Sequence, residues 1–162
     1  MNLVLIENID LPVKALHEDG SIESLSEEAV NELQNPVTLF IGGSINVINT
    51  PMPIKQARQI IKALPFALEE QLANDVENNH LHFIGRKDGK AYALTLSHDI
   101  MKSTVDRYAP SKLYFMPLLL PVIADTISVL VIEGYACVRI NDLNAFYLGR
   151  LIMNYSINLM TF

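Results

Sequence analysis

The chain has 162 residues and a mass of 18.1 kDa, which is enough for one domain of ordinary size or two small ones. Half of the residues are hydrophobic and 19 % are charged, a composition that supports a packed core and excludes a disordered or fibrous chain. Twelve basic against eighteen acidic side chains leave a net charge of −6, which argues against nucleic-acid binding because phosphate neutralisation needs clustered cations.

The first elements are expected to form a hairpin followed by a helix. Residues 3–7 have the pattern of a short apolar strand, residues 13–16 that of its hairpin partner, and Asp19-Gly20 that of a turn. Ser26 precedes two glutamates, as an N-cap precedes the acidic first turn of a helix. The helix is expected to end near Gln34, because the Asn-Pro pair that follows disfavours helical backbone.

A glycine-rich turn follows the next strand. Residues 37–41 predict a buried strand and residues 45–48 a return strand, with Gly42-Gly43-Ser44 as a tight turn between them. Such glycines could also cradle a phosphate, because they let backbone N–H groups approach an anion. A phosphate loop normally leads into a helix, whereas residues 45–48 have a strand pattern, so a plain turn is favoured.

Residues 54–76 carry the strongest helical pattern. Pro65 is expected to divide this segment into two helices or to kink a single one, because proline lacks an N–H and clashes with the preceding turn. Beyond it, every fourth residue from Leu68 to Val76 is expected to face the core, with Asp75 at the core edge. The first half has an apolar stripe of Ile54, Ala57, Ile61 and Leu64 and a basic stripe of Lys55, Arg58 and Lys62.

A second hairpin and a capped helix are expected next. Residues 80–84 and 91–96 predict two strands joined by a turn at Asp88-Gly89. Ser97 predicts the N-cap of a helix that runs to about Tyr108. Strands that first come in pairs and then alternate with helices imply an α/β fold, a mixed sheet with helices packed on it.

The C-terminal third predicts more strands and a final helix. Residues 113–115 have a strand pattern, residues 117–123 that of a short apolar helical turn, and residues 128–132 and 135–140 that of a strand pair. An amphipathic helix is expected from Asp142, with a stripe of Leu143, Tyr147, Leu151 and Tyr155. If Leu151, Ile152 and Tyr155 are exposed, this helix favours a homodimer.

The compartment is predicted from cysteine content and apolar stretches. The single cysteine, Cys137, excludes an internal disulfide framework and fits a reducing compartment. No N-terminal segment has the basic, then long apolar, then small residues that make up a signal peptide. The apolar stretches 116–124 and 127–138 are interrupted by prolines or by Glu133-Gly134 and fall short of the ~20 apolar residues that a membrane span needs. A cytosolic chain is therefore expected.

Several residues invite a catalytic or metal-binding interpretation, and in each case a simpler one is favoured. His80 and His82 would share one strand face, near Glu77, as metal ligands do, but packed or surface histidines are more common. His98-Asp99 opens a helix without an associated nucleophile, which favours a helix start over a catalytic dyad. Cys137 lies in an apolar strand, where thiols are usually inert.

Four carboxylates follow the proline-containing segment: Glu69, Glu70, Asp75 and Glu77. They suit an acid/base pair or a metal site in principle, and a solvated helix face is the commoner explanation for such residues. A third possibility is an acidic docking surface for a basic partner.

Residues 53–83 carry a family signature. The runs Pro-Ile-Lys-Gln-Ala-Arg-Gln, Ala-Leu-Pro-Phe-Ala-Leu-Glu-Glu-Gln-Leu-Ala-Asn-Asp-Val-Glu and His-Phe occupy residues 53–59, 63–77 and 82–83. This pattern resembles the cytoplasmic domain of the type II secretion system protein L family, with two extra residues before His-Phe. Weaker similarity continues at residues 39–48 and 114–122 and from residue 132 onwards.

The resemblance implies a ribonuclease-H-like, actin-related fold without catalytic activity, cofactor or metal. Residues 1–124 would form the N-terminal ribonuclease-H-like domain, and residues 125–162 the start of a second actin-like subdomain with a strand pair and a helix. The family acts as a scaffold that binds the N-terminal domain of the secretion ATPase and couples it to other inner-membrane platform proteins. It often dimerises, and it works at the cytoplasmic face of the bacterial inner membrane.

Two points qualify this expectation. The membrane helix and periplasmic region of the family have no counterpart here, so the chain is expected to be a fragment or a stand-alone paralogue. The actin relationship also raises an alternative, an actin-like nucleotide-binding adaptor of the pilus-assembly or cell-division type. Residues 8–12 lack the glycine of a nucleotide-binding turn, and residues 133–136 place bulk where a phosphate would approach, so the scaffold is favoured.

The helical segment around Pro65 is therefore the expected docking element. Glu69, Glu70 and Glu77 would pair with cations of the partner, and Arg58 and Lys62 would complete the partner-binding surface. Such charges at the rim of an interface mostly tune association rate and specificity. Asp75 is expected to be structural, with its side chain capping nearby backbone.

Overall fold

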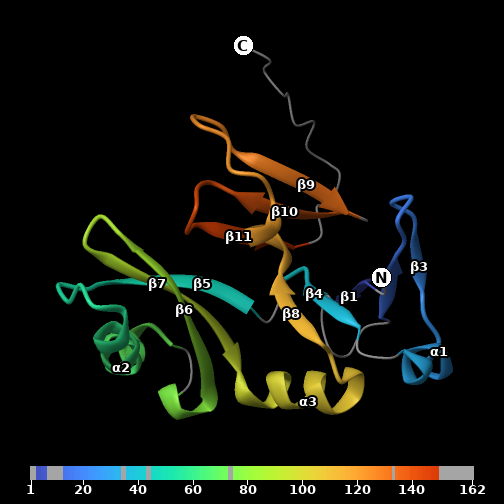
Figure 1. Cartoon of the computed structure of the whole chain (residues 1–162), viewed down its shortest axis with the longest axis horizontal. Helices are drawn as coiled ribbons and strands as arrows, with labels where there is room; N and C mark the ends of the chain where they lie inside the picture. Colours follow the sequence, from blue (N-terminus) through green and yellow to red (C-terminus); the bar gives the residue numbers. More distant parts are fainter. Residues whose placement is uncertain are drawn as a thin grey trace.

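The computed structural model of the chain describes residues 3–6, 13–33, 36–42, 45–72, 75–132 and 134–149 (Figure 1). The strands are β1 Leu3–Ile6, β2 Lys14–Leu16, β3 Ile22–Ser24, β4 Val37–Phe40, β5 Ile45–Pro51, β6 Asn79–Lys87, β7 Lys90–Ser97, β8 Lys112–Phe115, β9 Ser128–Ile132, β10 Tyr135–Arg139 and β11 Ala145–Leu148. The helices are α1 Glu27–Glu32, α2 Ala57–Leu68 and α3 His98–Tyr108, with short 3₁₀ turns η1 Glu69–Gln71, η2 Val76–Asn78 and η3 Met116–Leu119.

The first sheet has five strands in the order β3-β2-β1-β4-β8. Strands β1, β2 and β3 form an antiparallel meander, and β4 and β8 add to it in parallel with β1. Successive side chains point to opposite faces, so Val4 and Ile6 lie in one core and Leu5 in another. The mixed sheet with helices packed on it, expected from the sequence, is therefore confirmed.

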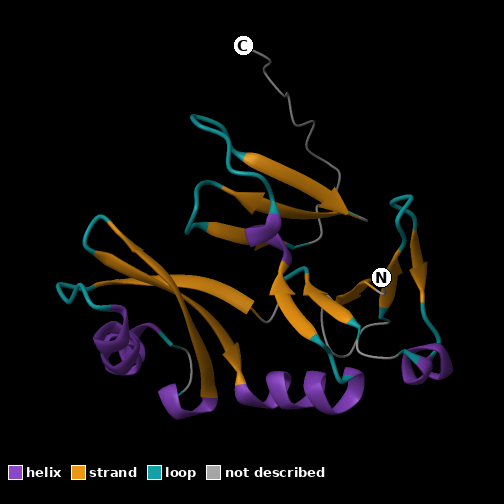
Figure 2. Ribbon diagram, viewed as in Figure 1, coloured by secondary structure: helices purple, strands orange, loops and turns teal. Residues whose placement is uncertain are grey.

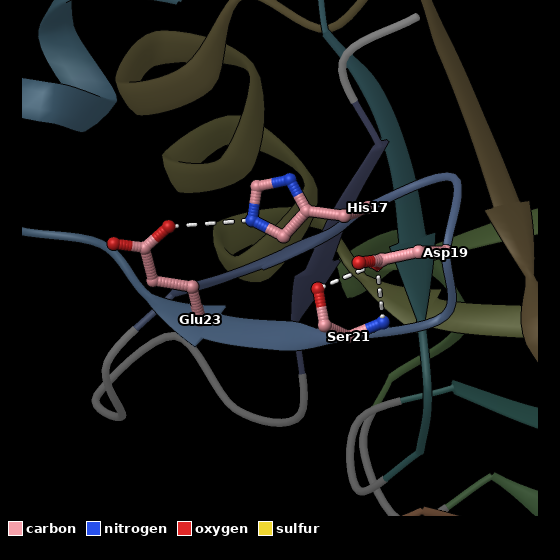
Figure 3. A network of polar contacts seen from close by, with 4 residues as sticks. All are labelled: His17, Asp19, Ser21 and Glu23. Atoms are coloured by element: carbon pink, nitrogen blue, oxygen red, sulfur yellow. Dashed lines mark hydrogen bonds and ion pairs between the residues drawn. The ribbon is translucent and has the colours of Figure 1, made fainter.

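A polar network fixes the β2–β3 hairpin at its turn (Figure 3). The Asp19 carboxylate accepts hydrogen bonds from the backbone N–H and the hydroxyl of Ser21, at 2.9 and 2.6 Å. These bonds, the hydroxyl bond first, lower the pKa of Asp19. His17 and Glu23 approach to 3.3 Å across the two strands. The expected turn at Asp19-Gly20 is confirmed, with Gly20 at a φ of 84°.

Strand β5 belongs to a separate three-stranded sheet of order β5-β7-β6. It pairs with β7, with Ile45 opposite Leu96, and not with β4. The strand expected at residues 45–48 is therefore confirmed, whereas its expected return alongside residues 37–41 is wrong. The strand pattern of residues 45–48 identified an extended segment but held no information on its partner, which lies far along the chain. The β6–β7 hairpin with its Asp88-Gly89 turn is confirmed, and both turn residues have positive φ.

Helix α2 packs on this second sheet. It continues through Pro65 to Leu68, and the residues beyond it form 3₁₀ turns. Of the two expected outcomes at Pro65, the single helix is therefore observed and the division into two helices is not. The inward stripe is Ile60, Leu64 and Leu68. Burying these three side chains against Met52, Ala91 and Ala93 outweighs the helix hydrogen bond that proline removes.

The last sheet has the order β11-β10-β9. Residues 145–148 form a strand where the sequence predicted a helix that starts at Asp142. The four-residue spacing of Leu143 and Tyr147 imitates helical periodicity, but Phe146 and Tyr147 pair with β10 at Val138 and Cys137. Residues 150–162, which include Leu151, Ile152 and Tyr155, lie outside the described residues.

A hydrophobic core covers each face of the first sheet. One core joins the first sheet to β9–β11 through Leu5, Leu39, Ile41 and Cys137. A second core lies between the first sheet and helices α1 and α3 and includes Val30 of α1 and Tyr108 of α3. Figure 2 shows the three helices along one side of the molecule and β9–β11 on the opposite side. No helix in the described part of the chain is both long and apolar enough to cross a membrane.

Candidate functional site

The outward face of α2 carries the residues that the sequence analysis assigned to partner binding. Arg58 and Lys62 are exposed on its first two turns, and Glu69 and Glu70 are exposed in η1, directly after its last turn. Glu77 is exposed in η2, which packs against α2. The structure therefore brings these five charged side chains to one helix and the two turns that follow it.

Two apolar side chains on α2 are exposed, which the sequence analysis did not predict. Phe66 is 78 % exposed, and Ile61, a member of the apolar stripe read from the sequence, is 55 % exposed. Ile60 takes the buried position instead, in one stripe with Leu64 and Leu68. The signal for Phe66 was available, since it follows Arg58 and Lys62 at four-residue spacing and so continues the basic stripe.

The backbone beneath this surface is held in place. The Thr50 hydroxyl on β5 donates a hydrogen bond to the Ala67 carbonyl at 3.1 Å. Nearby, the Arg86 Nε donates to the Met52 carbonyl at 3.2 Å and ties β6 to the segment after β5. The exposed side chains of α2 therefore project from a helix whose last turn is tied to the sheet by a hydrogen bond.

Asp75 does not have the expected role. Its side chain is exposed and makes no capping hydrogen bond, so its expected place at the core edge is wrong. Its carbonyl instead accepts hydrogen bonds from the Asn78 N–H at 2.9 Å and the Asn79 Nδ2 at 3.0 Å. The 3₁₀ turn after Leu68 changes the direction of the chain, so the wheel of a continuous helix no longer applies.

His80 and His82 lie on the face of the second sheet opposite to α2, because the alternate residues Leu81 and Phe83 pack with α2. His80 and His82 share one strand face, as expected, and line a cavity of about 160 Å³ with Leu94, Leu96 and Met101 among its walls. The rings of His80 and His98 meet edge to face with centroids 6.0 Å apart. Desolvation first, and then the charges of His98 and His82, lower the pKa of His80.

Metal and dyad interpretations gain no support from this geometry. Among the residues described, no group of three or more His, Cys, Asp or Glu side chains is placed to hold a metal ion. Ser97 caps α3 by accepting a hydrogen bond from the Ile100 N–H at 3.3 Å, which confirms that His98-Asp99 is a helix start.

Gly42 and Cys137 both lie in closely packed surroundings. A Cβ on Gly42 would overlap the ring of Tyr147, so the glycine permits this ring to pack against the chain after β4. The chain then enters β5 and not a helix, as the strand pattern of residues 45–48 predicted, and Gly43 and Ser44 lie outside the described residues. Cys137 is fully buried, which confirms its place in the core, and burial raises its pKa to about 11.

The structure describes only part of the two turns, residues 8–12 and 133–136, that were compared with nucleotide-binding turns. Gly134 has a φ of 88°, and the Tyr135 ring stacks on Tyr147 with centroids 5.8 Å apart. The first turn, residues 8–12, and Glu133 lie outside the described residues.

The topology defines the class of protein: an α/β domain with a five-stranded mixed sheet, two further three-stranded sheets and few helices. The family model for "Type II secretion system (T2SS), protein L" matches residues 14–141. The chain belongs to this family.

One solved structure from the same secretion system shares the fold. The cytoplasmic domain of EpsL, an inner membrane component of the type II secretion system of Vibrio cholerae, matches with a TM-score of 0.72 at 15 % identity, over 91 % of this chain and 70 % of that one. A Bacteroides thetaiotaomicron protein of actin-like ATPase fold and unknown function matches with a TM-score of 0.45 at 10 % identity, over 91 % and 68 % of the two chains. No curated protein matches the chain.

Proposed function

We propose that this chain is a non-catalytic cytoplasmic scaffold of a type II secretion inner-membrane platform, which recruits the secretion ATPase by binding its N-terminal domain. The membership in the protein L family supports the assignment to this system. The observation that carries the docking role is the exposure of Phe66 and Ile61 on a helix whose opposite face is locked into the core.

The proposed docking surface has an apolar centre and a charged rim. Exposed aromatic side chains surrounded by polar groups are typical of binding hot spots, so Phe66 would be the anchor. The rim is formed by Arg58, Lys62, Glu69, Glu70 and Glu77, whose charges would steer association and select the partner.

The proposed location is the cytoplasmic face of the bacterial inner membrane. It rests on the likeness to EpsL, whose matched part is the cytoplasmic domain of an inner membrane component. Other inner-membrane platform proteins would be the further partners that link the recruited ATPase to the membrane.

Calorimetry of the purified chain with the N-terminal domain of a secretion ATPase tests the proposal. Phe66→Ala is expected to weaken binding by more than about tenfold, whereas Val105→Ala, at an exposed position on α3, leaves it unchanged.

Charge reversal provides the second arm. Glu70→Lys/Glu77→Lys is expected to change affinity and its salt dependence, and Glu32→Lys/Asp106→Lys is the matched control, with the same change in net charge on α1 and α3. Equal binding by the Glu70→Lys/Glu77→Lys variant and its control would show that the rim charges do not contribute to docking. Failure of the unaltered chain to bind would remove the ATPase as partner, and magnesium-dependent binding of ATP in the same instrument would favour the nucleotide-binding adaptor.

A further inference from the structure

The cavity beside His80 and His82 lies where the second sheet meets α3 and β8, and its inner part is apolar. The buried side chains of Ile45 and Leu96 form its floor. Half-buried side chains form its walls, namely Leu94 on β7, Met101 on α3 and Leu113 on β8. Its volume of about 160 Å³ is close to that of an engineered apolar cavity that binds benzene, so it has room for one six-membered ring.

The path of α3 explains why this cavity exists. Strand β7 leads directly into α3 at Ser97, and α3 then runs away from the second sheet (Figure 1). Met101, on the second turn of α3, still reaches the cavity, whereas Tyr108 at the end of α3 lies in the core against the first sheet. The cavity therefore opens between the second sheet and a helix that diverges from it.

Imidazole rings form the mouth of the cavity. His80 lies opposite Leu96 and His82 opposite Leu94 in the β6–β7 pairing, and both histidines are exposed. The ring of His98, at the start of α3, meets that of His80 edge to face. Within the described part of the chain, no hydrogen bond or ion pair involves the ring of His80 or His82. Their ring nitrogens are therefore available to a ligand.

The charge around the mouth favours an anion. Of the residues that the structure describes, no acidic one lines the cavity. The charged residues that neighbour the lining in the sequence are exposed and lie outside it: Glu77, Asp99, Lys102 and Lys112. Imidazoles donate hydrogen bonds and gain positive charge near neutral pH. The cavity is thus complementary to a molecule with an apolar ring and a negative group at one end.

We propose that this cavity binds a monocyclic aromatic carboxylate. The ring lies against Leu94, Leu96 and Met101, where it is removed from water. The carboxylate accepts hydrogen bonds from His80 and His82, and bonds of this charge-assisted kind are stronger than neutral ones. The inference does not rest on ATPase recruitment, because the cavity lies on the face of the second sheet opposite to α2.

NMR titration of the full chain at about pH 6, with benzoate as the probe, tests the site. Benzoate is expected to shift the methyl resonances of Leu94, Leu96 and Met101 saturably. Acetate has the charge without the ring, benzyl alcohol has the ring without the charge, and benzylammonium has the opposite charge. Each is expected to bind about tenfold more weakly than benzoate, or less. Benzoate is also expected to raise the pKa of His80, because an opposite charge favours the imidazolium.

Two variants assign the binding to this cavity. Leu94→Phe fills the space of the ring and is expected to abolish the shifts. His80→Gln/His82→Gln removes the imidazoles and is expected to weaken benzoate binding about tenfold, while binding of benzyl alcohol stays unchanged. His17→Gln, on the β2–β3 hairpin, is the control for loss of a histidine and should bind benzoate as the unaltered chain does.

Several results would overturn the proposal. These are the absence of saturable shifts at millimolar benzoate, equal binding of benzoate and acetate, and full binding by a folded Leu94→Phe variant. If the amide spectrum shows that Leu94→Phe does not fold, the histidine variant decides, and an unchanged affinity of His80→Gln/His82→Gln for benzoate would overturn the proposal. None of these outcomes decides whether the ATPase domain binds, which the calorimetry tests separately.

Discussion

The Thr50 hydroxyl donates a hydrogen bond to the Ala67 carbonyl at 3.1 Å and so joins β5 to the last turn of α2. Thr50 is buried, and Ala67 immediately follows the exposed Phe66. The bond therefore fixes the end of the helix that presents the proposed anchor.

Removal of this hydroxyl should destabilise the fold. Thr50→Val keeps the shape of the side chain but leaves the Ala67 carbonyl without this donor, and about 0.5–1.5 kcal/mol of the free energy of unfolding is expected to be lost. Denaturant unfolding measures the change. Thr50→Ser, which keeps the hydroxyl, should retain most of it, and equal losses in the two variants would contradict the role of the bond.

Gly42 should not tolerate a side chain. Its Cβ would overlap the Tyr147 ring, so Gly42→Ala is expected to cost about 1–3 kcal/mol of stability through overpacking. Gly149→Ala is the control, because a Cβ there would meet no atom within 4 Å. The thermal midpoints of the two variants give the comparison, and an unchanged midpoint for Gly42→Ala would show that the ring moves aside freely.

Cys137 should be unreactive in the folded chain. Burial raises its pKa to about 11, so at pH 8 its thiolate fraction is of the order of one in a thousand. A thiol reagent is expected to modify it only after denaturation, and the time course of absorbance at both conditions measures this. Modification of the native chain as fast as of a free thiol would mean that the β10 core opens readily.

His80 should make stability fall on the acid side of neutrality. Its pKa is lowered below the ordinary value of 6.5, chiefly by desolvation, so the unfolded chain binds a proton before the folded chain does. Above about pH 6.5 the lowered pKa of His80 has no effect on stability. As the pH falls below that value, it reduces the free energy of unfolding.

The direction can be checked by unfolding across pH 5–8 and by NMR titration of the imidazole. His80→Gln is expected to flatten the acid decline, while His17→Gln, on the β2–β3 hairpin, should leave it in place. A His80 that titrates at or above 6.5 would contradict the prediction.

Asp75→Ala should have little effect on the stability of the fold. The carboxylate is exposed and makes no capping bond, so the change in the free energy of unfolding is expected to stay within about 0.5 kcal/mol. Asn79→Ala removes the side-chain bond to the Asp75 carbonyl and should cost more. Denaturant unfolding of both variants tests this order, and the reverse order would restore the capping role predicted from the sequence.

Local signals in the sequence identified most of the elements. The Ser26 and Ser97 caps, the Asp88-Gly89 turn and the strand before Gly42 depend on neighbours a few residues away, and all are observed. The family signature depended on residue types in residues 53–83, and the match to protein L confirms it.

The tertiary structure alone decided what those elements contact. It paired β5 with β7, made residues 145–148 a strand, and chose Ile60 over Ile61 for the core. It also left Phe66 exposed at the centre of the proposed surface. Strand partners and burial arise from contacts between residues far apart in the chain, so a pattern of spacing within one segment determines the element but not the surface that it presents.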